Sequence, residues 1–303
     1  MTRGTRCWFC GQTGLVLTNE HVLSRANFGG RLVAPKRVCE SCNSEAGGLE
    51  DKILTVPPLI EFVGVAAREL GRGYPEAEAI LQDGARGRAE ITPDGTRVIS
   101  FKPRKIGMEG DTEVWEVGEG DEKKVEDRRS KPGRRVKAVG RPLGQGDYMQ
   151  LAGGFGVDFF EMWPRFAAKV ALGCASLTLP EAWLDSEGAR LVQDLFQRGN
   201  APKRLWRGRG PKVPLGWPEL PPDDPLRRAL RRSEHILALS ANDEGDGTLL
   251  EMVLFGAIYY RLDLFDAECP DDEPAWLVSP SSRSGREPSE VLRARLLARV
   301  DEA

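Results

Sequence analysis

Two cysteine pairs near the N-terminus are the residues whose type and spacing most directly indicate chemistry. Cys7 and Cys10 form the first pair, Cys39 and Cys42 form the second, and two residues separate the cysteines within each pair. A C-x-x-C turn places two thiolates at two corners of a tetrahedron, and two such turns complete a four-sulfur zinc site. We therefore expect these four cysteines to bind a structural zinc ion, with redox-active dithiols as the alternative.

A zinc ion at this position would make a small N-terminal module stable. A segment of about 50 residues buries too little surface to fold alone, whereas zinc contributes on the order of 10–16 kcal/mol of apparent free energy to small modules. Residues 11–38 separate the two pairs, which is longer than the usual zinc-ribbon gap. This insert is where we look for catalytic residues.

The insert contains an acidic residue followed by histidine, Glu20-His21, and Asn43 directly follows the second cysteine pair. With C-x-x-C, acid-His and C-x-x-C-Asn in that order, the chain resembles the HNH endonuclease family over residues 7–51. The resemblance implies a ββα-metal unit, in which a hairpin presents the acid and the histidine and a helix begins near the second cysteine pair. It also implies metal-dependent hydrolysis of phosphodiester bonds in DNA, and a bacterial defence, restriction or mobile-element context.

The resemblance assigns a role to each residue of the motif. His21 matches the general base that activates water, and Glu20 and Asn43 match the residues whose oxygens help to hold a catalytic Mg²⁺ or Mn²⁺ ion. An imidazole with a pKa near ~6.5 can accept a proton at neutral pH, and such bases contribute about 10²–10⁴ in rate. Carboxylate and amide oxygens are suitable ligands for a hard divalent ion.

The chain departs from the family pattern at two places. The middle Asn of the pattern falls near Ala34. Either Asn27 or a backbone carbonyl orients the base in its place, with the carbonyl favoured, or turnover is reduced. Some relatives place a second histidine where this chain has Gly47. Glu50 or Asp51, about two turns beyond Asn43, could complete the metal shell, and the alternative is a solvated helix end.

Composition limits the classes of function that the chain can have. Its 303 residues are 40% hydrophobic and 29% charged, with a formal net charge of −3, which is typical of a globular protein with a sizeable core. The charge argues against a surface that binds nucleic acid indiscriminately. We see no signal peptide and no apolar run long enough to span a membrane, and we expect a cytoplasmic protein.

Residues 56–303 are predicted to form a larger domain after the 1–55 module, giving an α+β protein. Apolar spacing predicts a helix from residue 59 to 70 and mostly helical structure over 158–198. A Pro-Asp-Gly turn predicts a hairpin over 91–98. The other expected elements are strands at 113–117, 235–239 and 249–264 and a short C-terminal helix around 290–300.

Two basic segments are candidates for contact with DNA. Residues 121–141 hold nine Lys or Arg against four acids, a local charge of +5. We expect most of this segment to be a mobile loop or a partly exposed strand, in which Arg134 and Arg135 either contact phosphates or are merely solvated. The second segment, residues 203–212, is rich in Gly and Pro and places cations around a tryptophan that could stack on a base. Its candidate residues are Lys203, Arg204, Trp206 and Arg207.

Other reactive side chains have simpler interpretations. Cys174 and Cys269 are expected to be small buried hydrophobes, and His235 to be structural or exposed. The competing hypothesis for the whole chain is a non-catalytic zinc-binding module that docks nucleic acid or protein. Formation of a homodimer is a further hypothesis for the nuclease, because the resemblance implies an HNH domain that cuts only one strand at a time.

Overall fold

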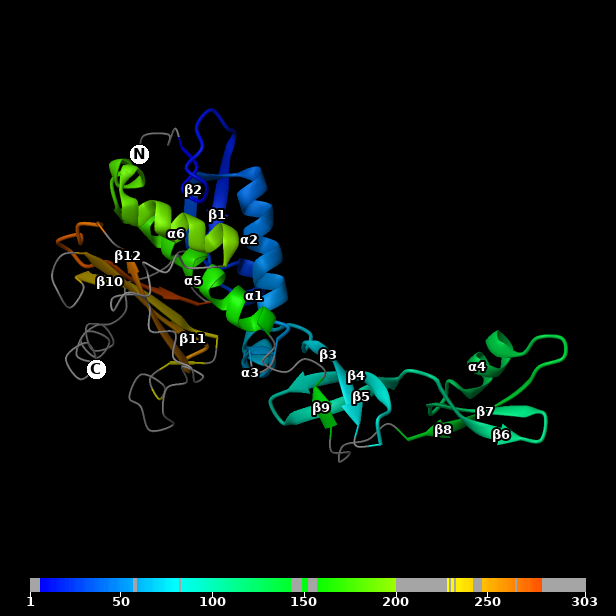
Figure 1. Cartoon of the computed structure of the whole chain (residues 1–303). Coiled ribbons are helices and arrows are strands. Elements are labelled where there is room, and N and C mark those ends of the chain that lie inside the picture. Colours follow the sequence, from blue (N-terminus) through cyan, green and yellow to red (C-terminus); the bar gives the residue numbers. More distant parts are fainter. Residues whose placement is uncertain are drawn as a thin grey trace. The chain divides into compact units, whose positions relative to one another are not determined.

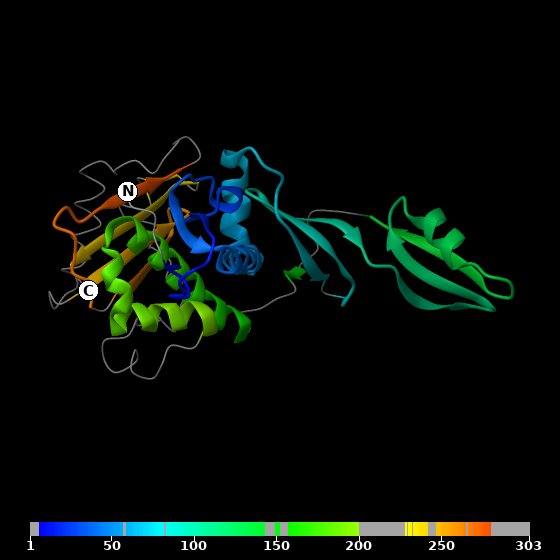
Figure 2. The same ribbon diagram turned by 90° about the horizontal axis from the view of Figure 1, so that it is seen from above.

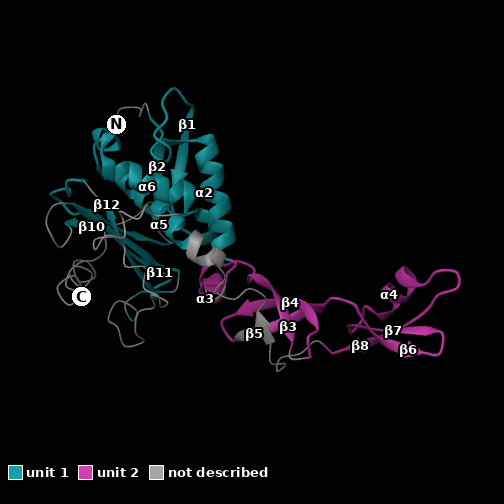
Figure 3. Cartoon of the chain, viewed as in Figure 1, with its two compact units in different colours: residues 1–54, 155–303 teal, residues 55–154 magenta. Residues whose placement is uncertain are grey.

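The chain divides into two compact units, residues 1–54 with 155–303 and residues 55–154 (Figure 3). The computed structural model describes residues 6–56, 59–81, 83–142, 149–151, 157–199, 228, 230–231, 233–241, 247–264 and 266–279. Both units combine helices and strands, which confirms the α+β class. The boundaries predicted from the sequence, 1–55 and 56–303, differ from this division, because the N-terminal segment packs against helices that follow residue 155.

Unit 1 begins with a hairpin and a helix. Strands β1 (Leu17–His21) and β2 (Val33–Cys39) pair antiparallel, and α2 (Glu40–Ile53) follows β2 directly. The short helix α1 (Arg25–Phe28) lies between the strands; the Ser24 side chain caps its first turn, and Gly29 ends it at a φ of 76°. The expected order of two strands and a helix is therefore present.

Helix α5 (Val157–Thr178) is the central element of unit 1. It packs against α2 and β2 on one side and against the four-stranded sheet at β12 on another (Figures 1 and 2). A 3-10 helix, η1 (Glu181–Asp185), leads into α6 (Glu187–Arg198), which packs along α5. The helical prediction for residues 158–198 is confirmed over both helices.

A four-stranded antiparallel sheet with the order β12-β11-β10-β13 completes unit 1. Its strands are β10 (His235–Ala241), β11 (Thr248–Leu254), β12 (Ile258–Leu264) and β13 (Ala275–Val278). The prediction of one strand over 249–264 is wrong. Phe255 and Gly256, at φ values of 53° and 58°, turn the chain back and split that stretch into the β11–β12 hairpin.

Phe28 joins the hairpin segment to the core of unit 1. Its ring stacks on Phe166 of α5 and on Phe255, and meets His235 edge-on, with centroid distances of 5.8, 5.4 and 5.1 Å. Aromatic pairs at these separations add to the stabilisation from apolar burial. The N-terminal segment therefore shares one apolar core with α5 and the C-terminal sheet.

Unit 2 contains α3 (Leu59–Leu70) and a sheet with the order β5-β4-β3-β9. Its strands are β3 (Glu76–Leu81), β4 (Arg86–Thr92), β5 (Gly95–Phe101) and β9 (Met149–Leu151). The predicted helix over 59–70 and the hairpin around Pro93-Asp94-Gly95 are confirmed. Gly64 allows α3 to approach β4 closely, since a Cβ there would lie 2.7 Å from the Ile91 carbonyl oxygen.

A second sheet of unit 2 has the order β6-β7-β8. Strands β6 (Arg104–Glu109) and β7 (Thr112–Gly118) form a hairpin, α4 (Glu122–Arg129) follows, and β8 (Arg135–Arg141) pairs parallel with β7. The strand predicted at 113–117 is confirmed. The partly exposed strand expected within 121–141 is present as β8, whereas the mobile loop is not: residues 122–129 form α4, the crossover that parallel pairing requires.

Two further expectations concern helices, one at the C-terminus and one long enough to span a membrane. The C-terminal helix expected around 290–300 falls outside the described residues. Among the residues that are described, no helix has the length and apolar character needed to cross a membrane.

Candidate metal centre and the acid-histidine strand

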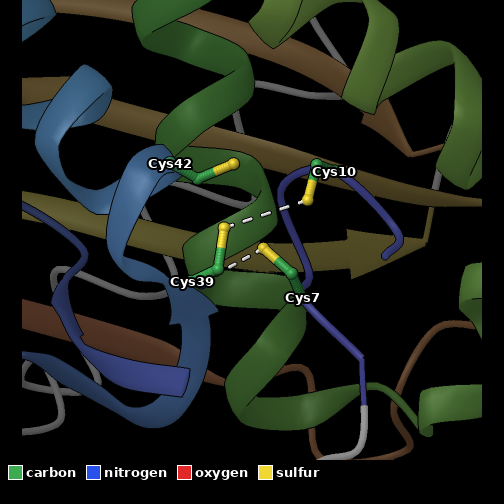
Figure 4. Close-up of side chains that lie close together, drawn as sticks. All are labelled: Cys7, Cys10, Cys39 and Cys42. Carbon is green, nitrogen blue, oxygen red and sulfur yellow. Dashed lines mark hydrogen bonds between the residues drawn. The ribbon is translucent and has the colours of Figure 1, made fainter. Parts of the chain in front are cut away.

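The four predicted cysteines come together in unit 1. Their Sγ atoms all lie within 4.8 Å of one another, and those of Cys10 and Cys39 are 4.0 Å apart (Figure 4). Cys7 and Cys10 flank a turn before β1, Cys39 ends β2, and Cys42 lies in the first turn of α2. The cluster can therefore hold a metal ion such as zinc.

The chemistry of the cluster suits a thiophilic ion. Tetrahedral zinc with Zn–S bonds of about 2.3 Å needs sulfurs about 3.8 Å apart, close to the observed spacing. A hydrogen bond with Cys42, and a further one from the Cys39 amide at 3.3 Å, lower the pKa of the Cys7 thiol to about 5. Burial raises the pKa of Cys10 to about 11. None of the six cysteines forms a disulfide.

Side chains from η1 and α6 support the cluster, and sequence reasoning did not find them. Gln197 donates to the Cys42 sulfur at 3.6 Å, and Gln193 donates to the Trp8 carbonyl at 3.0 Å. The Trp8 ring stacks on Trp183 at a centroid distance of 6.0 Å. Outer partners of this kind orient the ligands of a metal. In the sequence, the polar residues of the amphipathic helix α6 were the only sign that this helix could support the cluster.

Glu20 and His21 occupy the end of β1 and have different surroundings. Successive side chains on a strand point to opposite faces. The Glu20 side chain is buried, whereas that of His21 is half-buried. Glu20 pairs with Ala34 and His21 with Val33 on β2. The site therefore holds a buried carboxylate and a partly accessible imidazole.

Glu20 lies beside a buried lysine that the sequence did not single out. The ammonium of Lys169, on α5, contacts Glu20 Oε1 at 2.8 Å and Glu50 Oε1 at 2.9 Å. Burial raises the pKa of Glu20, although the Lys169 charge opposes this shift. The attraction of both carboxylates raises the pKa of Lys169 despite its complete burial. Lys169 is thus a charged partner of both acids.

The Asn43 side chain braces the motif strand. Its amide nitrogen donates to Thr18 Oγ1 at 2.9 Å and to the Asn19 carbonyl at 3.0 Å. Thr18 Oγ1 in turn donates to the Val38 carbonyl at 2.9 Å. Asn43 therefore links α2 to β1, and among the described residues its side chain forms no hydrogen bond with Glu20 or Glu50.

The remaining predicted positions surround α2. Asn27 donates to the exposed Asp51 carboxylate at 2.9 Å, and Ala34 is buried on β2. Glu50 is buried, so its alternative as a solvated helix end is wrong. The Ser24 amide donates to both Glu50 oxygens at 3.2 and 3.3 Å, which further fixes this carboxylate.

The His21 imidazole has the electrostatic character of a neutral base. Partial burial and the nearby Lys169 charge lower its pKa from the ordinary value of 6.5. At neutral pH the ring is therefore uncharged and able to accept a proton. Neither Asn27 nor a backbone carbonyl orients it as expected, because none of the described residues hydrogen-bonds its ring nitrogens.

The oxygen donors predicted for a catalytic divalent ion leave no open position for one, because the Lys169 ammonium already lies between the two carboxylates. Glu20 and Glu50 turn toward Lys169, and the Asn43 amide turns toward the β1 backbone. Apart from the cysteine cluster, the described residues contain no group of three or more His, Cys, Asp or Glu side chains placed to hold a metal ion. This donor arrangement does not fit a hydrated Mg²⁺ or Mn²⁺ ion.

The basic residues of unit 2 are largely paired with acids. Arg134 donates from Nε to Glu113 Oε2 at 3.0 Å, and Arg141 donates to Asp83 at 2.6 Å. Arg135 is exposed at the start of β8. Acids on neighbouring strands and turns thus offset part of the local charge of +5. The candidates Lys203, Arg204, Trp206 and Arg207 lie outside the described residues.

The other reactive side chains are structural or peripheral. His235 is fully buried, accepts at Nδ1 from the Phe255 amide at 3.0 Å and has Nε2 3.2 Å from the Phe28 carbonyl, which confirms its structural role. Cys174 is buried in α5 as expected, and its pKa is raised by burial. Cys269 is only half-buried, which corrects its prediction as a core residue.

No family model, curated protein or solved structure matches this chain.

Proposed function

We propose that the chain is a nuclease of the HNH type that hydrolyses phosphodiester bonds in DNA, with His21 as the general base. The observation that carries the proposal is the placement of a half-buried, neutral imidazole on the first strand of a ββα unit whose strand and helix meet at the cysteine cluster. His21 would take a proton from the water that attacks the phosphorus. Zinc in the cysteine cluster would hold β2 and α2 together.

The other two motif residues, Asn43 and Glu20, have a supporting part in this proposal. Asn43 ties the first turn of α2 to β1, and Glu20 anchors the end of β1 to Lys169. These contacts would hold the backbone that carries His21. Because the predicted oxygen donors do not fit a catalytic divalent ion, we assign no step of the reaction to one.

The test is cleavage of supercoiled plasmid DNA, with and without modified bases, by the wild type and by His21→Ala. Each protein is assayed with Mg²⁺, Mn²⁺ or EDTA after its zinc content has been measured. Val16→Ala, an exposed substitution beside β1, is the matched control. We expect the His21 variant to keep its zinc and lose about 10²–10⁴ in cutting rate, with the control unchanged.

Two results would overturn the nuclease proposal. Equal cutting by wild type and His21→Ala would remove His21 as the base. No cutting by the wild type under any of these conditions would reject the nuclease itself. DNA binding without cutting, measured by fluorescence anisotropy, would then support the second candidate.

The second candidate is a non-catalytic zinc-binding module that docks nucleic acid or protein. It is favoured by one specific observation, the engagement of Glu20 and Glu50 by Lys169 in place of an open cation site.

Mass photometry of the protein on DNA would test the hypothesis that two copies pair. A homodimer would add twice the mass of one chain to the mass of the DNA.

A further inference from the structure

Four oxygen atoms surround the Lys169 ammonium. Besides Glu20 Oε1 at 2.8 Å and Glu50 Oε1 at 2.9 Å, they are the Val22 carbonyl at 2.8 Å and the His21 carbonyl. An ammonium group has three protons to donate, so four acceptors exceed its hydrogen-bonding capacity. Two carboxylates and two carbonyls form the oxygen-rich surroundings that proteins otherwise provide for a hard cation.

The cluster is buried and its acids outnumber its cation. The Lys169 side chain is 1% exposed, and those of Glu20 and Glu50 are 5% and 1% exposed. Burying a charge is costly unless it is paired and hydrogen-bonded, and removing one partner of a buried pair leaves an uncompensated charge. In their charged form the two acids therefore require a cation at this position in the folded chain.

We infer that Lys169 is the resident cation of the Glu20–Glu50 pair and the positioning residue for the strand end that carries His21, in the place where the sequence predicted a divalent ion. The part that concerns His21 rests on the proposed function, whereas the cation-site part stands without it. Lys169 itself is too deeply buried to touch a substrate.

The contacts of α5 explain how one side chain can position this strand end. The Lys169 ammonium binds the carbonyls of His21 and Val22, while Glu50 of α2 binds the Ser24 amide. A Cβ at Gly173, one turn further along α5, would lie 3.2 Å from the Val22 methyl groups, so α5 follows this segment closely. The ammonium therefore joins β1, the turn after it, α2 and α5.

Thermal unfolding of zinc-loaded protein tests the charge balance. Lys169→Met, a neutral side chain of similar length, should lower Tm by on the order of 10 °C, because it strands two buried carboxylates. The double variant Lys169→Met/Glu50→Gln removes one of these charges and should recover part of the loss. A Tm for Lys169→Met within about 2 °C of the wild type would reject the inference.

Mn²⁺ binding tests whether the position of the Lys169 ammonium is a cation site. If Lys169 only packed against its neighbours, its replacement would not change how much Mn²⁺ the protein binds. Free Mn²⁺ is measured by its paramagnetic resonance signal during titration of zinc-loaded full-length chains. Lys169→Ala should gain one bound Mn²⁺ that also raises its Tm, and Lys169→Ala/Glu50→Gln should not. Failure of Lys169→Ala to bind the ion would overturn the inference.

The wild type decides the matter if the variants fail to fold. The inference predicts no Mn²⁺ binding that depends on Glu20, because Lys169 already holds that carboxylate. Stoichiometric binding by the wild type that Glu20→Gln abolishes would show a divalent ion in place of the ammonium and overturn the inference. None of these measurements requires cleavage, so their outcome is separate from that of the nuclease assay.

Discussion

Burial of a neutral His235 should make unit 1 less stable at acidic pH. The ring lies between Phe28 and Phe255, at centroid distances of 5.1 and 5.0 Å, with no exposure to solvent. Its Nδ1 accepts from the Phe255 amide, so the neutral ring carries its proton on Nε2 and donates to the Phe28 carbonyl. A proton on Nδ1 would break the bond to the Phe255 amide and leave a charge in an aromatic cage.

The size of the effect follows from the pKa of His235. Burial lowers this pKa from 6.5 to about 3. Between these two values the unfolded chain binds a proton that the folded chain does not, so the free energy of unfolding falls as the pH falls below 6.5. The slope is about 1.4 kcal/mol per pH unit, which gives a loss of about 2 kcal/mol between pH 7.5 and 5.0 from this side chain alone.

Urea unfolding of the zinc-loaded wild type and of His235→Gln at both pH values would measure this effect. The glutamine cannot titrate, so other titrating groups cancel in the comparison between the two proteins. We expect the variant to be less stable at pH 7.5 but to lose about 2 kcal/mol less than the wild type on acidification. Equal losses by the two proteins would refute the argument that His235 is buried in its neutral form.

Two further predictions concern the metal centre and unit 2. Elemental analysis should find one zinc per chain in the wild type and in Cys269→Ser, but little zinc in Cys42→Ser. Removal of the zinc from the wild type should lower its Tm. Equal zinc contents in the two variants would reject the four-cysteine site. Gly64→Ala should destabilise unit 2 by about 1–3 kcal/mol without loss of zinc, because the new Cβ would overlap the Ile91 carbonyl. Urea unfolding would measure this loss, with Gly107→Ala as the control, because a Cβ at Gly107 meets nothing within 4 Å. Equal free energies of unfolding for the two variants would contradict the prediction.

Features set by local chemistry could be predicted from the sequence. The C-x-x-C spacing brings two sulfurs together within one turn, which is why the four-cysteine cluster was predictable. Apolar periodicity identified α3, and the Pro-Asp-Gly turn identified the β4–β5 hairpin. The extent of the long C-terminal strand was not predictable, because the turn at Phe255 and Gly256 lies inside a continuous apolar run.

The basic segment of unit 2 shows why charge in sequence differs from charge in space. Counted along the chain, residues 121–141 are strongly positive. Folding places Glu113 beside Arg134 and Asp83 beside Arg141, so acids from outside the segment offset part of its charge. Only the pairing of β8 with β7 and the approach of the β3–β4 turn decide these partners.

The spacing of the cysteines was enough to predict the cysteine cluster, because each C-x-x-C turn brings two sulfurs together locally. The resemblance carried by the motif residues implied two strands and a helix around the acid-histidine pair. Only the tertiary structure decided what the acids face. Lys169 lies more than 100 residues from Glu20 in the chain, within an apolar stretch of α5. A buried charge there must be paired, but the spacing of residues in the sequence does not show which acid pairs with it. Packing of α5 against the hairpin and α2 brings that charge to both carboxylates.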